Sequence, residues 1–600
     1  MNVGDITGTG ETGAGSQAPP VPVGTASAGL VGTDPARPRP GTERPGLAGA
    51  LRVLRTTTVS VTAEPGLLDP ANPFLLDTLG RPRRVVVPDS PTPYTDLVAR
   101  YLDAQRVRGL LTEHIRLPAQ TTADGAASLG AAERLAAAAA AAGLGRRDAF
   151  LVCGDSAESR AGLAAAALLR RHTLAVQVVA ELPDLIGAVR GARRLGLRPQ
   201  AAITDRRQVT IVIDQDRLAL PGAGTLTAAP AAVERAELVS LPVEFAPGLV
   251  DGAATLDRWT SADARVLAVV DDYSASVVSR VRQTLDRIVA AGGASAREVM
   301  PVTSSRTTKR REGVEAILRR ADRLGFGSRD LIVAVGGGTV LDLVGTAALL
   351  YRGGSPYLRI PTTLVGMIDA GIGLKVAIDA GGRKNLLGGY HPPLACLCDP
   401  GFLDTLPGIE MRCGLAEAVK IAMVADEELF SHIEREHAAA VRRPRGPEAA
   451  RIMRGAIRVM QDQLAANPYE QELRRLPDFG HEFGHLLETA SGFRLRHGEA
   501  VSVGMALSAG LAVETGRLAR PRFDRFIRLL TEIGLPVFDP LCEPGRLSRW
   551  LNEDVSANKG GRPHLVVPTG IGAGGFIDLA AEITGPMLNR TRDLLSGYRR

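Results

Sequence analysis

The first two thirds of the chain alternate between short apolar runs and longer stretches in which Ala, Leu and Arg recur at helical spacing. The apolar runs that we expect to form strands are Val85–Val87, Leu151–Val152, Val266–Val270 and Leu331–Val335. Short β-branched runs separated by helical stretches are typical of a parallel sheet with helices on its faces. This part of the chain is therefore predicted to be an α/β structure.

After about residue 400 the strand pattern fades and helical periodicity dominates. The clearest amphipathic stretches are Gly414–Phe430, Ala450–Leu464 and Val501–Thr515. Apolar residues that recur every three or four positions indicate helices with one buried face. We expect a helical domain at this end of the chain.

Three blocks of sequence recur later in the chain, all at the same offset. The matched pairs are Glu64–Asp69 with Ala246–Asp251, Arg83–Asp89 with Arg265–Asp271, and Leu144–Gly154 with Phe326–Gly336. A constant offset over three blocks indicates an internal duplication. Because duplicated sheets share surfaces, we expect the first copy to pack on the second much as a partner subunit would.

The segment 1–50 is rich in Gly, Pro, Thr and Ala and contains almost no large apolar side chain. Such a segment cannot bury enough surface to offset the entropy lost on ordering, so it is predicted to be disordered. The resulting plan is a tail at 1–50, a degenerate α/β copy at 51–230, a nucleotide-binding α/β domain at 231–400 and an all-α domain at 401–600.

Composition excludes several classes of protein. A chain of 600 residues with 45% hydrophobic and 23% charged residues is globular and too long for one core. The net charge is only +6 and aromatic residues are 4%, which argues against a nucleic-acid stacking surface. No apolar run approaches the ~18 residues of a membrane span, and five scattered cysteines favour free thiols. We expect a cytoplasmic protein that binds neither nucleic acid nor membrane.

A glycine turn follows the apolar run Leu331–Val335. Three glycines between a strand and a helix let backbone N–H groups approach a pyrophosphate, although the spacing is not the usual dinucleotide fingerprint and a plain turn would have the same pattern. In the first copy the turn reads Gly154-Asp155-Ser156, and Arg160 takes the place of Asp342. The acidic side chain of Asp155 in this turn repels phosphate. The first copy is therefore predicted to have lost nucleotide binding and to act as a scaffold or regulatory domain.

Two later segments, Pro361–Lys375 and Arg383–Gly388, gather lysines, hydroxyls and an amide among glycines. Ammonium and amide groups suit phosphate oxygens, although surface solvation would explain each lysine singly. These segments predict a site for an anionic substrate.

Gly480–His485 contains the pattern His-Glu-x-x-His. The spacing places His481 and His485 on one helix face and matches the zinc peptidase signature. Gly484 weakens the helix that such a motif needs, and a peptidase requires neither the glycine turn nor the lysines. A metal site of another kind and a structural pair of histidines are the alternatives at this point.

Taken together, these motifs resemble the dehydroquinate synthase-like sugar phosphate cyclases. The matching segments, in the order and spacing of that family, are Gly336–Asp342, Pro361–Thr363, Asp369–Lys375, Lys384–Asn385, Gly414–Lys420, Gly480–His485 and Arg496–Val501. The resemblance covers about residues 245–580. It implies an α/β nucleotide-binding domain followed by an all-α metal domain, here preceded by a degenerate α/β duplicate.

The resemblance also implies roles for individual residues. It makes Glu417, His481 and His497 the ligands of zinc or cobalt. It places His485, Asp369, Lys375, Lys384, Asn385, Lys420, Arg474 and Asp478 around the substrate. It places NAD on Gly336, Gly337, Gly338, Asp342, Thr362, Thr363, Asp271 and Lys309. Arg352 is implied to reach the phosphate site of a neighbouring subunit, which would fit a homodimer.

In the family, NAD removes and returns a hydride while phosphate is lost, and an aldol step then closes the ring. Dehydroquinate synthases bind the substrate carboxylate with a lysine at the position where this chain has Met460. They also have an asparagine where this chain has Asp478, and a C-terminal lysine at about the position of Ala557. These departures, with Asn467–Glu470, favour sedoheptulose 7-phosphate and a valiolone-type cyclitol.

Several alternatives stay open at this stage. Gly484-His485, where many such cyclases have Ser-Pro, leaves the product stereochemistry open between 2-epi-valiolone and 2-epi-5-epi-valiolone. Arg306, where the family often has an acidic residue, weakens the likeness of the NAD pocket. The other functions weighed are a 3-dehydroquinate or aminodehydroquinate synthase, a deoxy-inosose-forming relative, an NAD- and metal-dependent alcohol dehydrogenase and an inactive regulatory protein.

Overall fold

The computed structural model describes residues 47–64, 67–89, 94–118, 128–145, 148–154, 156–169, 174–179, 195–197, 201–203, 208–214, 231–251, 258–305, 307–555, 564–578 and 582–598. Residues 1–46 of the predicted tail, together with Asp155, Arg306 and Ala557, lie outside these ranges. The end of that tail, 47–50, is not disordered, because it opens the first strand at Leu47.

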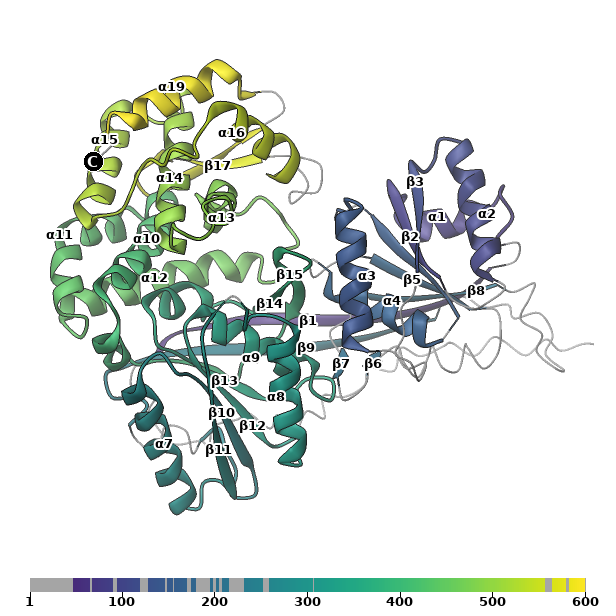
Figure 1. Cartoon of the computed structure of the whole chain (residues 1–600), viewed down its shortest axis with the longest axis horizontal. Coiled ribbons are helices and arrows are strands. Elements are labelled where there is room, and N and C mark those ends of the chain that lie inside the picture. Colours follow the sequence, from purple (N-terminus) through teal and green to yellow (C-terminus); the bar gives the residue numbers. More distant parts are fainter. Residues whose placement is uncertain are drawn as a thin grey trace, which may run out of the picture. The chain divides into compact units, whose positions relative to one another are not determined.

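One sheet of twelve strands runs through both α/β copies (Figure 1), in the order β11-β10-β12-β13-β16-β9-β1-β8-β5-β4-β2-β3. In the first copy the strands are β1 (Leu47–Glu64), β2 (Arg84–Pro88), β3 (Glu113–Leu117), β4 (Ala149–Cys153), β5 (Leu174–Val179) and β8 (Gln208–Asp214). In the second copy they are β9 (Ala231–Phe245), β10 (Arg265–Asp271), β11 (Ala296–Val302), β12 (Leu331–Gly336), β13 (Tyr357–Pro361) and β16 (Ala395–Cys398). All neighbours are parallel except β1 and β9, which pair antiparallel.

Helices cover the sheet and short hairpins extend from it. The helices of the first copy are α1 (Phe74–Thr78), α2 (Tyr94–Val107), α3 (Leu129–Ala141) and α4 (Ala157–Leu168), and those of the second are α7 (Ala275–Ala290), α8 (Arg311–Arg323) and α9 (Gly338–Leu350). The hairpins are β6 (Leu195–Leu197) with β7 (Ala201–Ile203), and β14 (Lys375–Ala380) with β15 (Arg383–Tyr390). A π-helical turn, η1 (Gly366–Ala370), lies between β13 and β14.

The duplication extends to the three-dimensional structure. Helix α3 begins at Leu129 and α8 at Arg311, which is the offset of the sequence blocks, and strands β4 and β12 begin at the same offset, at Ala149 and Leu331. The order of the strands outward from β1 matches the order outward from β9. The two halves of the sheet are therefore built alike.

Alternation along β10 explains how the second copy is layered. Val266, Ala268 and Val270 pack into the core that contains α7, whereas Leu267 and Val269 pack into the core that contains α8 and α9. Successive strand residues point to opposite faces, so each face of this sheet receives its own helices. Figure 1 shows α7 on one side of these strands and α8 and α9 on the other.

The rest of the chain is largely helical. Its helices are α10 (Gly408–Ala425), α11 (Glu427–Arg442), α12 (Pro447–Ala466), α13 (His481–Ala490), α14 (His497–Glu514), α15 (Arg520–Ile533), α16 (Pro544–Trp550) and α19 (Gly585–Ser596). Short turns of other helix types are η2 (Pro400–Thr405), η3 (Leu476–Asp478) and η4 (Leu551–Val555). The domain is not purely α, because β17 (His564–Gly570) and β18 (Ala573–Asp578) form a hairpin.

Helix α13 packs very closely on α14, and Gly484 makes this possible. A Cβ atom at Gly484 would lie 3.1 Å from Val501 Cα and 3.3 Å from the carbonyl oxygen of Ala500. The glycine that weakens the His-Glu-x-x-His helix in the sequence is thus required by packing against α14.

We predict that Gly484→Ala will lower the free energy of unfolding by about 1–3 kcal/mol, since backbone atoms cannot move aside cheaply. Thermal unfolding measures this effect. Gly545→Ala is the matched control, because nothing lies within 4 Å of a Cβ there and alanine favours the helix. Equal midpoints for Gly484→Ala and the native protein would contradict the packing argument.

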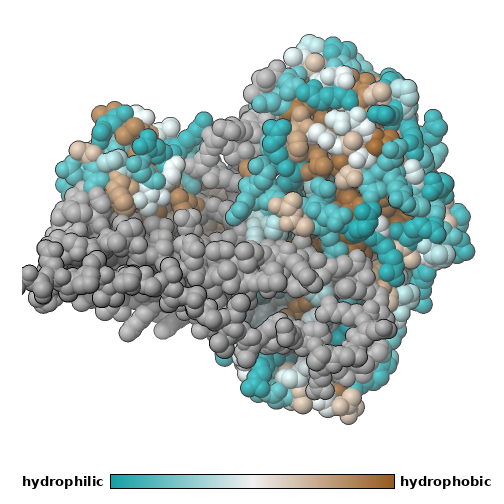
Figure 2. Space-filling model, turned by 180° about the vertical axis from the view of Figure 1, so that it is seen from behind, coloured by the Kyte–Doolittle hydropathy of each residue, from teal (hydrophilic) through white to brown (hydrophobic). Residues whose placement is uncertain are grey.

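The surface of the described residues is mostly polar. The large hydrophobic side chains that are exposed among them are Val107, Leu110, Tyr273 and Phe493, and Figure 2 shows apolar groups set among polar ones over the helical domain. Within the described ranges, no helix is both long and apolar enough to cross a membrane. All five cysteines are buried and none forms a disulfide, as the sequence predicted.

Candidate active site

A cavity of about 1000 Å³ lies at the carboxyl ends of the strands of the second copy. Strands β10, β12 and β13 are parallel and end at Asp271, Gly336 and Pro361. Ligands of open α/β sheets bind at this edge. Residues of α10, α12, α13 and α14 line the cavity from the helical domain.

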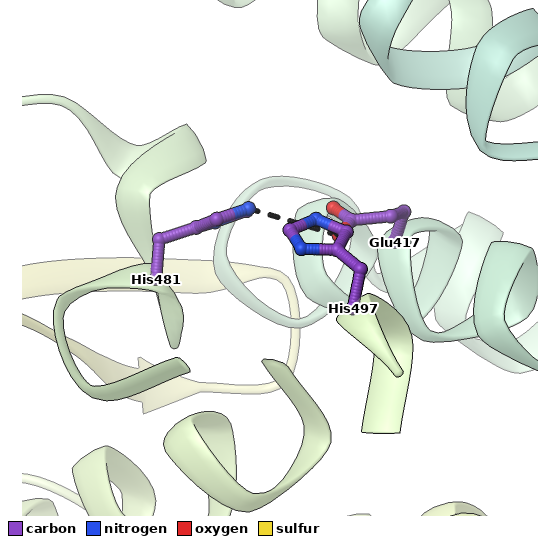
Figure 3. Close-up of side chains that lie close together, drawn as sticks. All are labelled: Glu417, His481 and His497. Carbon is purple, nitrogen blue, oxygen red and sulfur yellow. Dashed lines mark ion pairs between the residues drawn. The ribbon is translucent and has the colours of Figure 1, made fainter. Parts of the chain in front are cut away.

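Three side chains that are far apart in the sequence meet beside this cavity (Figure 3). Glu417 projects from α10, His481 is the first residue of α13 and His497 is the first residue of α14. The Nε2 atoms of His497 and His481 lie 3.1 and 3.7 Å from Glu417 Oε1. The two histidines line the cavity, while Glu417 lies just behind its wall.

This cluster has the donors and the spacing of a metal site. One ligand atom from each of the three residues lies within 4.8 Å of the others. Both carboxylate oxygens of Glu417 are buried, and Nδ1 of His481 is buried without a hydrogen-bond partner in the part of the chain that the structure describes. A carboxylate and two imidazoles match a catalytic zinc set, which leaves further positions for substrate. The residues therefore fit a divalent cation.

Charges around Glu417 are closely balanced. Burial would raise the pKa of Glu417, but Lys420, whose Nζ lies 2.6 Å from Oε2, and the two histidines hold that pKa well below its usual value. Lys420 is itself buried and also lies 3.1 Å from Asp369. Burial opposes its charge, yet Asp369 and Glu417 raise its pKa. The carboxylate and the ammonium are both charged at neutral pH.

The two histidines differ in protonation. Burial, and then Lys420, lower the pKa of His481 to about 3. Burial also opposes charge on His497, but hydrogen bonds to Glu417 and Glu488 raise its pKa to about 9. The metal-free protein therefore carries a neutral His481 and a protonated His497 at neutral pH.

His485 lies beside this cluster and belongs to a second group with Glu488 and His497, whose ligand atoms also lie within 4.8 Å of one another. Glu488 bonds Lys384 Nζ at 2.7 Å and lies 3.3 Å from His497 Nδ1. Burial, and then His481, lower the pKa of His485 well below its usual value. His485 is thus a neutral imidazole facing the cavity.

Sequence reasoning missed Glu488, although its signal was present. His481, His485 and Glu488 stand at helical spacing, so they share one face of α13. The carboxylate of Glu488 connects the predicted metal ligand His497 with the predicted phosphate residue Lys384.

The glycine turn lines the same cavity as the histidines and opens helix α9. Gly337 and Gly338 line the cavity with Thr363, and no side chain caps α9. A Cβ at Gly337 would lie 3.1 Å from Thr363 Cγ2, so a side chain would fill the cradle. Lys309 Nζ bonds Asp342 and Asn385 at 2.6 and 2.7 Å beside it. Uncapped N–H groups next to a lysine fit an anionic diphosphate.

The first copy differs at the same turn. Ser156 caps α4, because its Oγ accepts a hydrogen bond from the Ser159 N–H at 3.2 Å. Gly338, the counterpart of Ser156 in the second copy, has no side chain that could do this. The N–H groups that would face a phosphate are partly satisfied within the first copy.

The structure corrects the expected position of Arg474. The family resemblance implies that Arg474 lies around the substrate, but Arg474 is absent from the residues that line the cavity, and its guanidinium stacks over Phe576 at 4.7 Å. Arg475 lines the cavity instead and pairs with Glu470 at 2.6 Å and Asp478 at 2.9 Å. Two buried or half-buried carboxylates hold Arg475 inward, and this leaves Arg474 on the outer side.

Two other predicted residues, Thr362 and Gly336, do not line the cavity either. The Thr362 N–H donates to the Gly336 carbonyl at 3.0 Å, at the end of β12. Arg352, which the family resemblance implies for the phosphate site of a neighbouring subunit, has a left-handed backbone, with φ of 46°, and lies 4.0 Å from Asp322. The remaining predicted substrate and nucleotide residues do line it, namely Asp369, Lys375, Lys384, Asn385, Lys420, Asp478, His485, Gly337, Gly338, Asp342, Thr363, Asp271 and Lys309.

Comparison with known proteins identifies the family. Residues 299–413 match the 3-dehydroquinate synthase N-terminal family and residues 414–554 match the 3-dehydroquinate synthase C-terminal family. A 2-epi-5-epi-valiolone synthase of Streptomyces glaucescens is 39% identical over 59% of this chain and 91% of its own. The chain belongs to the dehydroquinate synthase-like sugar phosphate cyclases.

Two further proteins are similar to this cyclase. A 3-dehydroquinate synthase of Nitrobacter hamburgensis is 37% identical over 46% of this chain and 70% of its own. A solved 2-epi-5-epi-valiolone synthase of Streptomyces hygroscopicus subsp. jinggangensis, with NAD⁺ and Zn²⁺ bound, is 36% identical, with a TM-score of 0.56, over 60% of this chain and 98% of its own. The glycine turn of this cyclase falls in its N-terminal family match, and Glu417, His481 and His497 fall in the C-terminal one.

Proposed function

We propose that this enzyme converts sedoheptulose 7-phosphate into a valiolone-type cyclitol with loss of phosphate, as a carbon–oxygen lyase acting on phosphates. One observation carries the proposal: the Glu417, His481 and His497 cluster and the uncapped glycine turn face a single cavity lined by lysines. The names of the relatives from Streptomyces, one of them solved with NAD⁺ and Zn²⁺, support it.

In this proposal Glu417, His481 and His497 hold zinc or cobalt, and Gly337 and Gly338 hold the diphosphate of NAD. When bound, the metal polarises a substrate hydroxyl and NAD accepts and returns a hydride. Lys375, Lys384 and Asn385 bind phosphate oxygens. Lys420 and Asp369 hold a proton at the wall of the cavity beside Glu417.

Met460 and Asp478 carry the choice of substrate. Both line the cavity, and neither offers a positive charge to a carboxylate. The ion pair of Asp478 with Arg475 reduces the repulsion that the Asp478 carboxylate would exert on a substrate carboxylate. What remains is the missing cation at Met460, which a neutral hydroxymethyl group does not need.

A 3-dehydroquinate or aminodehydroquinate synthase is the second candidate, and Arg475 is the observation that favours it. Its guanidinium lines the cavity and is a natural partner for a carboxylate. Glu470 and Asp478 already occupy it, however. A substrate carboxylate would have to displace one of them.

Turnover with each substrate tests the proposal directly. The purified chain, with NAD⁺ and Zn²⁺ or Co²⁺, is given sedoheptulose 7-phosphate and, separately, the dehydroquinate precursor, while phosphate release and product mass are followed. We expect phosphate release from the first substrate alone, with no net NADH. Turnover of only the second would assign a dehydroquinate synthase, and net NADH would assign an alcohol dehydrogenase.

Metal affinity should rise with pH. Metal binding requires a neutral His497, which holds a proton below about pH 9 in the metal-free protein. Between pH 6 and 8, the apparent Kd for Zn²⁺ should fall about tenfold per pH unit, with close to one proton released. Calorimetry in two buffers of different ionisation enthalpy measures that proton.

Glu488→Gln is the matched variant for this measurement, because Glu488 raises the pKa of His497. It should reduce the proton release near neutral pH. An affinity that does not change between pH 6 and 8 would contradict the assignment of His497 as a ligand.

We infer that the chain is divided into domains at 51–230, 231–400 and 401–600. We also infer that the enzyme is cytoplasmic and that it binds a small sugar phosphate. Nucleotide binding is assigned to the second copy alone, because Ser156 caps the turn of the first.

A further inference from the structure

We propose that the amino-terminal copy is a built-in partner subunit that holds the β14–β15 hairpin, and with it Lys384 and Asn385, at the substrate cavity. Contacts between the two copies support the position of the hairpin. The catalytic importance of that position rests on the proposed function, which gives Lys384 and Asn385 their role.

The two copies are joined as the subunits of a twofold dimer are. In the antiparallel pair of β1 with β9, Arg55 lies opposite Glu237, which is its own counterpart at the offset of the duplication. The pairing is reciprocal around this point, since Val53 faces Val239 and Thr57 faces Arg235. Such self-complementary pairing is the mark of an isologous interface. Figure 1 shows the two strands running together.

Contacts outside the sheet repeat the same symmetry. Helix α4 contacts β15, and α9, the counterpart of α4, contacts β7, the counterpart of β15. Arg311 bonds Glu133 in the first copy at 2.6 Å and Glu315 in its own helix at 2.8 Å, and these two glutamates are counterparts of each other in the duplication. The first copy thus occupies the place that an identical domain would take.

The hairpin needs such support. A two-stranded hairpin is marginally stable alone, and β14 and β15 pair only with each other among the described strands, apart from a single bridge between Leu387 and Leu169 of the first copy. Leu386 and Leu387 are buried in the same core as Leu135 and Ala136 of α3. The first copy therefore supplies part of the packing that keeps the hairpin in place.

The turn of the hairpin lies directly against α3. A Cβ atom at Gly381 would be only 2.9 Å from Cβ of Ala137. Shortly after this turn, Lys384 reaches Glu488, and Asn385 has a left-handed φ of 49° while its Oδ1 accepts from Lys309. A left-handed backbone conformation at a residue other than glycine persists when the surrounding structure holds it. Movement of α3 at Ala137 would accordingly move both side chains.

Wedge variants test this inference in the full-length protein. Ala137→Phe should speed hydrogen–deuterium exchange of residues 383–390, raise KM for sedoheptulose 7-phosphate about tenfold or more and lower kcat less. Metal content and the unfolding midpoint should stay near the native values. Ala137→Val should give a smaller change in the same direction, which keeps the test valid if phenylalanine prevents folding.

Two controls complete the design. Ala137→Ser, which adds one small atom, should keep the native KM, and Val107→Asp alters an 82% exposed site of the first copy and should change neither exchange nor KM. Native exchange and KM in both wedge variants would overturn the inference. If the wedges speed exchange but even the native protein does not turn over the sugar phosphate, the proposed function fails and the built-in partner stands.

Discussion

Replacing Glu417 with glutamine will release the metal and lower kcat/KM for sedoheptulose 7-phosphate by at least about a hundredfold, the upper range seen when groups that merely support a ligand are lost. Glu417 is the one carboxylate of the proposed ligand set and is fully buried. Without its charge, a dication would be held by two imidazoles beside the ammonium of Lys420, 2.6 Å from Oε2 in the native protein. Removing one partner of a buried charge pair is strongly unfavourable.

Metal content by elemental analysis and kcat/KM measure this effect, and Glu482→Gln is the matched control. Glu482 is also buried and follows His481 directly, but its Oε1 accepts a hydrogen bond from the Val566 N–H at 3.1 Å, which glutamine retains. We expect the control to keep its metal and most of its activity. A Glu417→Gln enzyme that retains metal and activity would show that the ligand set is wrong, whereas a Glu482→Gln enzyme that loses its metal would show that metal loss is not specific to Glu417.

The second large effect concerns specificity. Met460→Lys should raise kcat/KM for the carboxylate-bearing dehydroquinate precursor, relative to sedoheptulose 7-phosphate, by at least about tenfold. Met460 is almost fully buried on α12 and lines the cavity. One charge-assisted hydrogen bond contributes about 1.5–3 kcal/mol, which corresponds to a change of about tenfold to a hundredfold.

Met460→Gln separates charge from polarity, because it adds donors of similar reach without an ammonium group. We expect it to leave the ratio of the two kcat/KM values close to native. Adding Asp478→Asn to Met460→Lys should shift the ratio further, since Arg475 would then lose one of its two carboxylate partners among the described residues and keep Glu470. An unchanged ratio in Met460→Lys would mean that Met460 does not face the substituent that distinguishes the two substrates.

Local pattern was sufficient for much of the fold and for part of the site. The blocks that recur at a constant offset predicted a duplication, and the structure places strands and helices at matching positions in both copies. The strand that runs into Gly336–Gly338 and the pair His481 and His485 follow from chain periodicity, which short-range backbone geometry sets. The position of the predicted metal ligand Glu417 came from family resemblance, because no local spacing relates it to histidines that lie on other helices.

Tertiary packing decided the remainder. Adjacent arginines have no periodicity that distinguishes them, so Arg475 and not Arg474 faces the cavity because Glu470 and Asp478 lie there to pair with it. In the sequence Gly484 only weakens a helix, whereas in the structure it allows the backbone of α14 to pack closely against α13. The pairing of β1 with β9 joins strands that are far apart in the sequence. The sequence by itself determined the elements and their chemistry, whereas long-range contacts decided which side chains meet, since such contacts depend on how whole faces pack.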